Sequence, residues 1–135
     1  MERDPRSIPE ESMKILVIDD SAVMRRIHRN ILKERGIADQ DIIDAEDGQV
    51  ALEIAAKNTI GLFLVDWNMP RLDGLDFVHR VRAMESYAKT PIIMITSEAA
   101  RYNVVEAIQA GVTNYVVKPI KGEALIEKIG KYLDA

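Results

Sequence analysis

The chain has 135 residues, of which 47% are apolar and 30% are charged, and its formal net charge at pH 7 is −4. This length is sufficient for one domain with a buried core and is too short for a second. The acidic balance argues against a general affinity for nucleic acid. Because the chain has no cysteine, disulfides, thiolate catalysis and cysteine-ligated zinc are excluded.

The first 13 residues contain Pro5 and Pro9 among charged residues and serines, without any sustained periodicity. This composition predicts a flexible N-terminal leader, and we expect residues 14–135 to form a single domain. The sequence has neither the pattern of a secretion signal nor an apolar run long enough to cross a bilayer. We therefore expect a cytoplasmic protein that does not insert into membranes.

After the leader, short apolar runs alternate with longer segments whose apolar residues recur every three or four positions. Runs this continuous predict strands buried on both faces, so the expected fold is an α/β protein with a five-stranded parallel sheet wrapped by five helices. The predicted strands are Ile15–Ile18, Ile42–Ala45, Leu62–Val65, Ile92–Ile95 and Tyr115–Val117.

The helical segments are predicted from their apolar stripes. These stripes are Met24, Ile27 and Ile31; Val50 and Ile54; Leu75, Val78 and Val81; Val104 and Ile108; and Leu125, Ile129 and Leu133. Gly36 and Gly111 follow the first and fourth stripes, where a helix often ends in a residue with positive φ.

Polar side chains follow the carboxyl ends of four of these predicted strands. They are Asp19, Asp20, Asp66, Thr96 and Lys118. In an open parallel sheet these ends lie along one edge, so the side chains should meet there. Neighbouring carboxylates repel one another unless a cation compensates, and hard oxygen ligands favour Mg²⁺.

The same set of residues is suited to phosphoryl transfer. A carboxylate can attack phosphorus, while a metal ion and a lysine neutralise the phosphoryl oxygens. The Thr96 hydroxyl can donate a hydrogen bond to one of these oxygens. An acyl phosphate on Asp66 would engage all of these groups.

Several motifs, in this order along the chain, resemble the receiver domains of two-component response regulators, and among them the CheY-like chemotaxis receivers. They are Asp19-Asp20, Ala45-Glu46-Asp47-Gly48, Asp66-Trp67-Asn68-Met69-Pro70, Asp73-Gly74-Leu75, Thr96-Ser97-Glu98 and Tyr115-Val116-Val117-Lys118-Pro119. The resemblance covers roughly residues 14–133 and implies a flavodoxin-like, doubly wound sheet with strand order 2-1-3-4-5.

The resemblance also implies roles for individual residues. Asp66 would be the phosphoacceptor, and Asp19, Asp20, Asp66 and the Asn68 carbonyl would hold Mg²⁺. Thr96 and Lys118 would contact the phosphoryl group, and Thr96 with Tyr115 would form the switch. Asn68 and Glu98 would tune the lifetime of the acyl phosphate, and the Lys118–Pro119 bond would be cis.

For function, the resemblance implies a stand-alone response regulator without an output domain. A CheA-like histidine kinase would be the phosphodonor, and the face formed by the fourth helix, fifth strand and fifth helix would bind a flagellar motor switch protein or another protein target. We expect a monomer that binds no nucleic acid. It would be a signalling protein and not an enzyme that turns over substrates, catalysing only its own phosphorylation and dephosphorylation.

Other interpretations remain open at this point. The receiver could be a phosphorelay intermediate or a kinase-feedback component. A hydrolase that uses an aspartyl nucleophile is a remote alternative, and a flavin-binding module of the same fold would need a phosphate-binding loop that the sequence lacks. Arg25, Arg26 and Arg29 near His28 predict a basic patch, either a solvated surface or a docking site for the phosphodonor.

Overall fold

The computed structural model describes residues 13–97, 101–118 and 120–133. They form a five-stranded parallel sheet in the order β2-β1-β3-β4-β5. Along the chain the elements are β1 (Ile15–Ile18), α1 (Ala22–Glu34), η1 (Asp39–Asp41), β2 (Ile42–Ala45), α2 (Gly48–Lys57), β3 (Leu62–Asp66), α3 (Gly74–Arg82), η2 (Glu85–Tyr87), β4 (Ile92–Ser97), α4 (Arg101–Ala110), β5 (Asn114–Lys118) and α5 (Gly122–Leu133). The predicted flavodoxin-like fold and strand order are confirmed.

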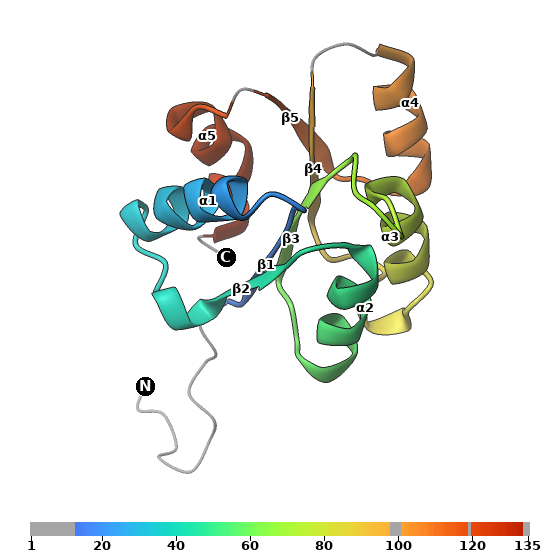
Figure 1. The fold of residues 1–135 in the computed structure, drawn as a ribbon, viewed down its shortest axis with the longest axis horizontal. Coiled ribbons are helices and arrows are strands. Elements are labelled where there is room, and N and C mark those ends of the chain that lie inside the picture. Colours follow the sequence, from blue (N-terminus) through green and yellow to red (C-terminus); the bar gives the residue numbers. More distant parts are fainter. Residues whose placement is uncertain (1–12, 98–100, 119, 134–135) are drawn as a thin grey trace.

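Helices cover both faces of the sheet, with α1 and α5 on one face and α2, α3 and α4 on the other (Figure 1). Alternate residues of each strand point to opposite faces, so the sheet divides the core into two clusters. One cluster packs strand residues such as Ile15 and Val17 against Leu32 of α1 and Leu125 and Ile129 of α5. The other packs the opposite strand residues against α2, α3 and α4.

The strands β3, β4 and β5 extend beyond the predicted bounds at their carboxyl ends, whereas β1 and β2 have the predicted bounds. Asp66 is the last residue of β3, Lys118 is the last residue of β5, and β4 runs one residue past Thr96. The predictions stopped where the apolar runs stop, but backbone pairing continues into the polar residues. Three of the predicted site residues, Asp66, Thr96 and Lys118, are therefore held by the sheet itself.

Two of the predicted helical stripes do not coincide with the buried faces. In α1 the buried residues are His28 and Leu32, while Ile27 is 37% exposed. In α4 Ala107 is buried and Ile108 is 48% exposed. In α4 a small residue lies against the core, whereas the prediction assigned the inner face of each helix to large apolar residues.

Helix termini also agree with the sequence signals. Gly36 and Gly111 have positive φ angles of 108° and 114°, as predicted for residues that follow a helix. The side chains of Ser21, Asp47 and Asp73 accept hydrogen bonds from backbone N–H groups at the starts of α1, α2 and α3. These caps fix the loops that leave the carboxyl ends of three neighbouring strands.

The predicted leader mostly lies outside the described residues, because residues 1–12 are not described. Met13 is described, and it packs against the core cluster beneath α1 and α5. Met13, which the prediction assigned to the leader, is therefore part of the packed structure. In the part of the chain that the structure describes, no helix combines the length and apolar character needed to cross a membrane.

Candidate functional site

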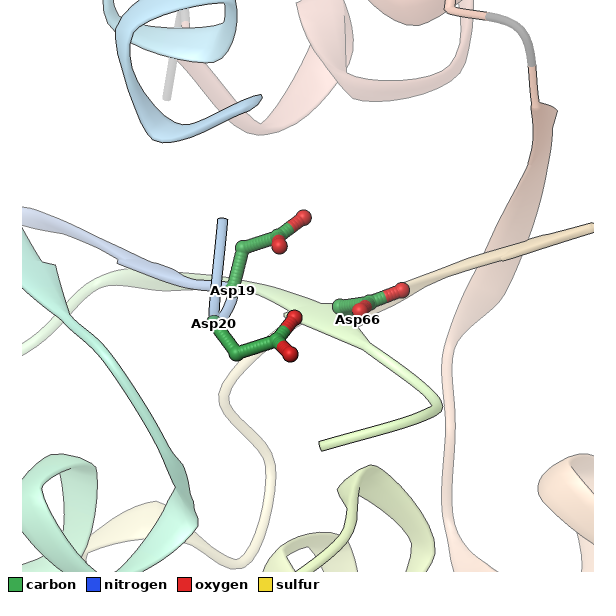
Figure 2. Close-up of side chains that lie close together, drawn as sticks. All are labelled: Asp19, Asp20 and Asp66. Atoms are coloured by element: carbon green, nitrogen blue, oxygen red, sulfur yellow. The ribbon is translucent and has the colours of Figure 1, made fainter. Parts of the chain in front are cut away.

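Three aspartates meet at the carboxyl ends of β1 and β3. Asp19 and Asp20 directly follow β1, and Asp66 ends the neighbouring strand β3. Each carboxylate offers an oxygen atom, and these atoms lie within 4.8 Å of one another. Figure 2 shows the three side chains together at this edge of the sheet. The sequence correctly predicted that they would be brought together.

Asp19 is almost completely buried, and one of its oxygen atoms has no partner. Its Oδ1 accepts a hydrogen bond from the Ser21 backbone N–H at 2.9 Å. Its Oδ2 is buried and has no hydrogen-bond partner in the structure. A buried carboxylate oxygen without a donor is costly, so this atom is suited to binding a cation.

Lys118 is the charged partner of Asp66. Its Nζ lies 2.8 Å from Asp66 Oδ1, although the two residues come from different strands. Asp66 pairs with Ile95 across β3 and β4, and Lys118 pairs with Ser97 across β4 and β5. Lys118 thus lies slightly further along the edge, from where its long side chain reaches back over β4 to the carboxylate.

Burial and the charges of neighbouring carboxylates raise the pKa values of Asp19 and Asp66. Burial raises the pKa of Asp19 to about 6, and the charges of Asp66 and Asp20 add to this increase. Burial also raises the pKa of Asp66, although the hydrogen bond and charge of Lys118 oppose this effect. One lysine does not neutralise three clustered carboxylates, so the site has an excess of negative charge.

The donor atoms of this cluster fit a hard divalent cation. Carboxylate oxygens in the absence of cysteine favour Mg²⁺ among the common metals, and Mg²⁺ typically uses few protein ligands. The partnerless Oδ2 of Asp19 and the close approach of the other two carboxylates are what such an ion requires. The acidic cluster is therefore a site that could hold a metal ion.

The remaining predicted site residues surround this cluster in different ways. Thr96 is buried near the end of β4, on the strand beside Asp66. Asn68 is exposed in the loop that follows β3. Tyr115 lies on β5 and packs partly against the core beneath α3 and α4, with Lys128 Nζ 5.4 Å from its ring centre. Glu98 and the Lys118–Pro119 bond lie outside the described residues.

The predicted basic patch on α1 is not a free cationic surface. Arg29 forms ion pairs with Asp44 at 2.6 Å and with Asp39 at 2.9 Å. Arg25 lies near Asp44 and donates to the Asp19 carbonyl oxygen at 2.6 Å. His28 is buried. The prediction overlooked acidic partners on β2 and in the turn before it, which are close in space but distant in sequence.

Sequence reasoning also missed an ion pair beside the site. The Arg71 guanidinium donates from two nitrogen atoms to Oδ2 of the buried Asp47. Asp47 was recognisable only as part of a motif, and nothing in the sequence marks Arg71 as its partner. The pair joins the loop after β2 to the loop after β3.

The start of α3 packs tightly against the end of β3. The Gly74 N–H donates to the Trp67 carbonyl oxygen at 2.8 Å. A Cβ atom at position 74 would overlap the Asp66 carbonyl oxygen. Only glycine therefore permits the loop to close in this way.

Known proteins share this sequence pattern. The model of the response regulator receiver domain matches residues 15–130. A chemotaxis protein CheY homolog from Campylobacter jejuni is 44% identical over 118 residues, which are 87% of this chain and 89% of that protein. The chemotaxis protein CheY of Pseudomonas aeruginosa is 42% identical over 122 residues, covering 90% and 97% of the two chains.

The fold is also similar to that of solved structures. The chemotaxis response regulator CheY4 of Vibrio cholerae superposes with a TM-score of 0.83 at 32% sequence identity, covering 91% of this chain and 100% of that chain. The family model, the relatives and the solved structures agree with one another on the family. The chain belongs to the response regulator receiver domain family and is similar to its CheY chemotaxis proteins.

Proposed function

We propose that this protein is a phosphorylation switch in which Asp66 accepts a phosphoryl group from a histidine kinase. The observation that carries the proposal is the arrangement of Asp66, with Lys118 Nζ 2.8 Å away and two further aspartates beside it. A buried aspartate with both a lysine and a cation site has the groups that phosphoryl transfer requires. Membership of the receiver family supports the same conclusion.

The chemical step is a displacement at phosphorus. A carboxylate oxygen of Asp66 forms the new P–O bond while the P–N bond of the phosphohistidine breaks. The departing imidazole nitrogen keeps the electron pair of that bond and takes up a proton from solvent. Ionised Asp66 needs no general base, because a carboxylate is already the nucleophile.

Lys118 and Thr96 stabilise the transferred group. The Lys118 ammonium contacts the Asp66 carboxylate in this structure. After transfer it would lie within reach of a phosphoryl oxygen and balance the charge of that oxygen. The Thr96 hydroxyl donates a hydrogen bond to a second oxygen. Asp19, Asp20, Asp66 and the Asn68 carbonyl would hold Mg²⁺, which supplies charge neutralisation of the phosphoryl oxygens when bound. Asn68 and Glu98 would tune the lifetime of the acyl phosphate.

The readout of phosphorylation lies on the face of α4, β5 and α5. Movement of Thr96 toward the phosphoryl group leaves room for Tyr115 to turn inward, and this reshapes the face. Val105, Ile108 and Val117 are 57%, 48% and 40% exposed there. Exposed apolar residues of this kind support a role in binding a protein partner.

For this partner we propose a flagellar motor switch protein, with a CheA-like kinase as the phosphodonor. The support is the similarity to chemotaxis proteins that cover most of the chain. Affinity capture with the beryllofluoride-treated protein tests the partner. Enrichment of a motor switch protein only in the treated sample is expected, whereas enrichment of a phosphotransfer protein would identify a phosphorelay intermediate instead.

Phosphorylation itself is tested by incubating the protein with acetyl phosphate and Mg²⁺ and measuring intact mass. Wild type should gain one phosphoryl group, and Asp66→Asn should gain none. Asp76→Asn is the matched control, because Asp76 is an exposed aspartate on α3 and its loss should leave labelling unchanged. Equal labelling of wild type and Asp66→Asn would disprove the proposal. Multiple turnover of small phosphate monoesters would identify a hydrolase instead.

A further inference from the structure

The Arg71–Asp47 ion pair joins two loops at the rim of the acidic cluster. Asp47 is buried, and its side chain has two roles. Its Oδ1 caps α2 by accepting from the Val50 N–H at 2.9 Å. Its Oδ2 accepts from Nε of Arg71 at 2.9 Å and from Nη2 of the same residue. Asp47 is thus fixed by helix α2 and offers Arg71 a rigid anchor.

Arg71 has an unusual backbone conformation. Among the described residues it is the only one other than glycine with positive φ, at 67°. The Leu72 N–H donates to the Pro70 carbonyl oxygen at 2.8 Å, which forms a tight turn centred on Arg71. Side chains disfavour this region, so the surrounding structure must hold the residue in it.

The same two loops also touch through their backbones. A Cβ atom at Gly48 would lie 2.7 Å from the Leu72 carbonyl oxygen, so the loops approach as closely as a glycine allows. Asp47 and Gly48 are consecutive in one loop, and Arg71 and Leu72 are consecutive in the other, so the ion pair and this backbone contact lie side by side. Together they fix the loop of residues 67–73 against the start of α2.

The ion pair borders the cation site. Asp20, Glu46, Asp47, Pro70 and Arg71 line one depression of about 550 Å³. Asp20 belongs to the acidic cluster, and Asn68 lies on the same loop as Arg71, three positions before it. A displacement of this loop would therefore change the placement of Asn68 relative to the cluster.

We propose that the Asp47–Arg71 ion pair is a latch that positions the loop carrying Asn68 and so sets the affinity for Mg²⁺. Arg71 is a positioning residue in this scheme and does not contact the ion. The inference rests on the proposed function, because it assumes that Asn68 contributes a ligand to Mg²⁺.

The direction of the effect distinguishes a latch from simple electrostatics. Arg71 is a cation near a cation site, so removing its charge would strengthen Mg²⁺ binding if only the field mattered. Loss of the latch would weaken binding instead. Arg71→Gln is therefore diagnostic, since the two explanations predict opposite changes.

The experiment is a Mg²⁺ titration of the unphosphorylated protein, followed by calorimetry and by fluorescence of Trp67, the single tryptophan. We expect Arg71→Gln to weaken binding by about tenfold, as is typical when a group that orients a ligand is lost. Arg71→Lys should restore part of the affinity. Arg80→Gln, which removes an exposed arginine from α3, should bind like wild type.

A double-mutant cycle tests the pair itself. Asp47→Asn keeps an oxygen to cap α2 but removes the charge that Arg71 contacts, so it should also weaken binding. The double variant with Arg71→Gln should be no weaker than the weaker of the two single variants, because both changes break one latch. Fully additive effects would overturn the proposal, and so would binding by Arg71→Gln as tight as wild type or tighter.

Phosphorylation with acetyl phosphate separates this proposal from the proposed function. If the latch acts only through the metal, Arg71→Gln should need more Mg²⁺ for half-maximal labelling but should reach the wild-type rate at saturation. A lower rate at saturating Mg²⁺ would contradict the latch. Wild type that is neither labelled nor binds Mg²⁺ would instead disprove the proposed function. Unchanged thermal unfolding of Arg71→Gln in EDTA should show that the fold is intact.

Discussion

At the scale of single residues, Asp19 combines near-complete burial with an oxygen atom that lacks a partner. The residue is 1% exposed, and burial together with Asp66 and Asp20 raises its pKa to about 6. The folded protein thus holds a proton at Asp19 more tightly than the unfolded chain does. Ionisation of Asp19 lowers the free energy of unfolding as the pH rises from about 4 to 6.

We predict that Asp19→Asn stabilises the protein in EDTA at pH 7.5, by about 2 kcal/mol. An amide carries no charge and keeps an oxygen atom for the Ser21 N–H. The same variant should bind Mg²⁺ poorly, so that adding Mg²⁺ no longer raises its stability. Urea unfolding with and without Mg²⁺ measures both effects, and a less stable variant in EDTA would refute the prediction.

His28 has the opposite dependence on pH. It is buried on α1, neither ring nitrogen has a partner, and burial lowers its pKa to about 4, with the charge of Lys118 contributing. The unfolded chain therefore binds more protons at this residue between pH 4 and 6.5. This contribution makes stability rise with pH, and it opposes the contribution of Asp19 over the same range.

For His28→Leu we predict a gain in stability of about 1 kcal/mol at pH 7, because two buried nitrogen atoms without hydrogen bonds are removed. The pH profile should also change: relative to wild type, the free energy of unfolding of the variant should decrease as the pH rises from about 4 to about 6, because the opposing contribution of His28 is lost. His79→Leu is the control, since His79 is exposed. Urea unfolding at several pH values in EDTA gives the profile, and the prediction fails if the two variants behave alike.

The sequence predicted well that these carboxylates lie together, because topology alone gathers residues at the carboxyl ends of strands. It did not predict which buried groups would lack a hydrogen-bond partner, such as Asp19 Oδ2. The Asp47–Arg71 pair joins residues 24 positions apart, in loops whose approach no local pattern encodes.

At the scale of secondary structure elements, Arg82 joins the C-terminal end of α3 to the segments that precede β4 and β5. From the last turn of α3 its guanidinium donates to the carbonyl oxygens of Tyr87, Thr90 and Gly111, at 2.6 to 2.9 Å. Tyr87 and Thr90 lie in the connection from α3 to β4, and Gly111 lies in the connection from α4 to β5. A single cation thus satisfies backbone groups in two connections.

Replacing Arg82 by methionine should destabilise the protein by about 2–3 kcal/mol, because it leaves these carbonyl oxygens without their donor. The methylene groups of methionine keep much of the packing. Arg80→Met on the exposed side of α3 should change stability by less than about 0.5 kcal/mol. Chemical unfolding compares the two, and equal values would show that the Arg82 contacts contribute little.

The strands were predictable because a short, continuous apolar run is compatible with few structures other than a buried strand. The inner faces of α1 and α4 were not, since His28 and Ala107 face the core while Ile27 and Ile108 face outward. An apolar residue on a helix indicates the face that packs on the core only when that residue does not serve to bind another molecule. On α4 the exposed apolar residues belong to the face proposed to bind a partner.

At the scale of the whole molecule, the proposed Mg²⁺ site in the acidic cluster would make stability depend on the ion. A ligand that binds only the folded state stabilises it by an amount that grows with the logarithm of its concentration. We predict that Mg²⁺ raises the melting temperature of wild type, with about 2.7 kcal/mol gained at a hundredfold excess over the dissociation constant. Asp76→Asn should respond equally, and a wild-type melting temperature insensitive to Mg²⁺ would contradict the prediction.

The close packing of Gly74 against Asp66 has a consequence for mutational tolerance. In a library of variants, position 74 should accept no other residue, even though glycine here touches no ligand and starts an ordinary helix. A side chain there would push against the Asp66 carbonyl oxygen and so move the proposed phosphoacceptor. Selection for signalling and selection for folding would then exclude the same substitutions at position 74, and neither selection alone would show which requirement excludes them.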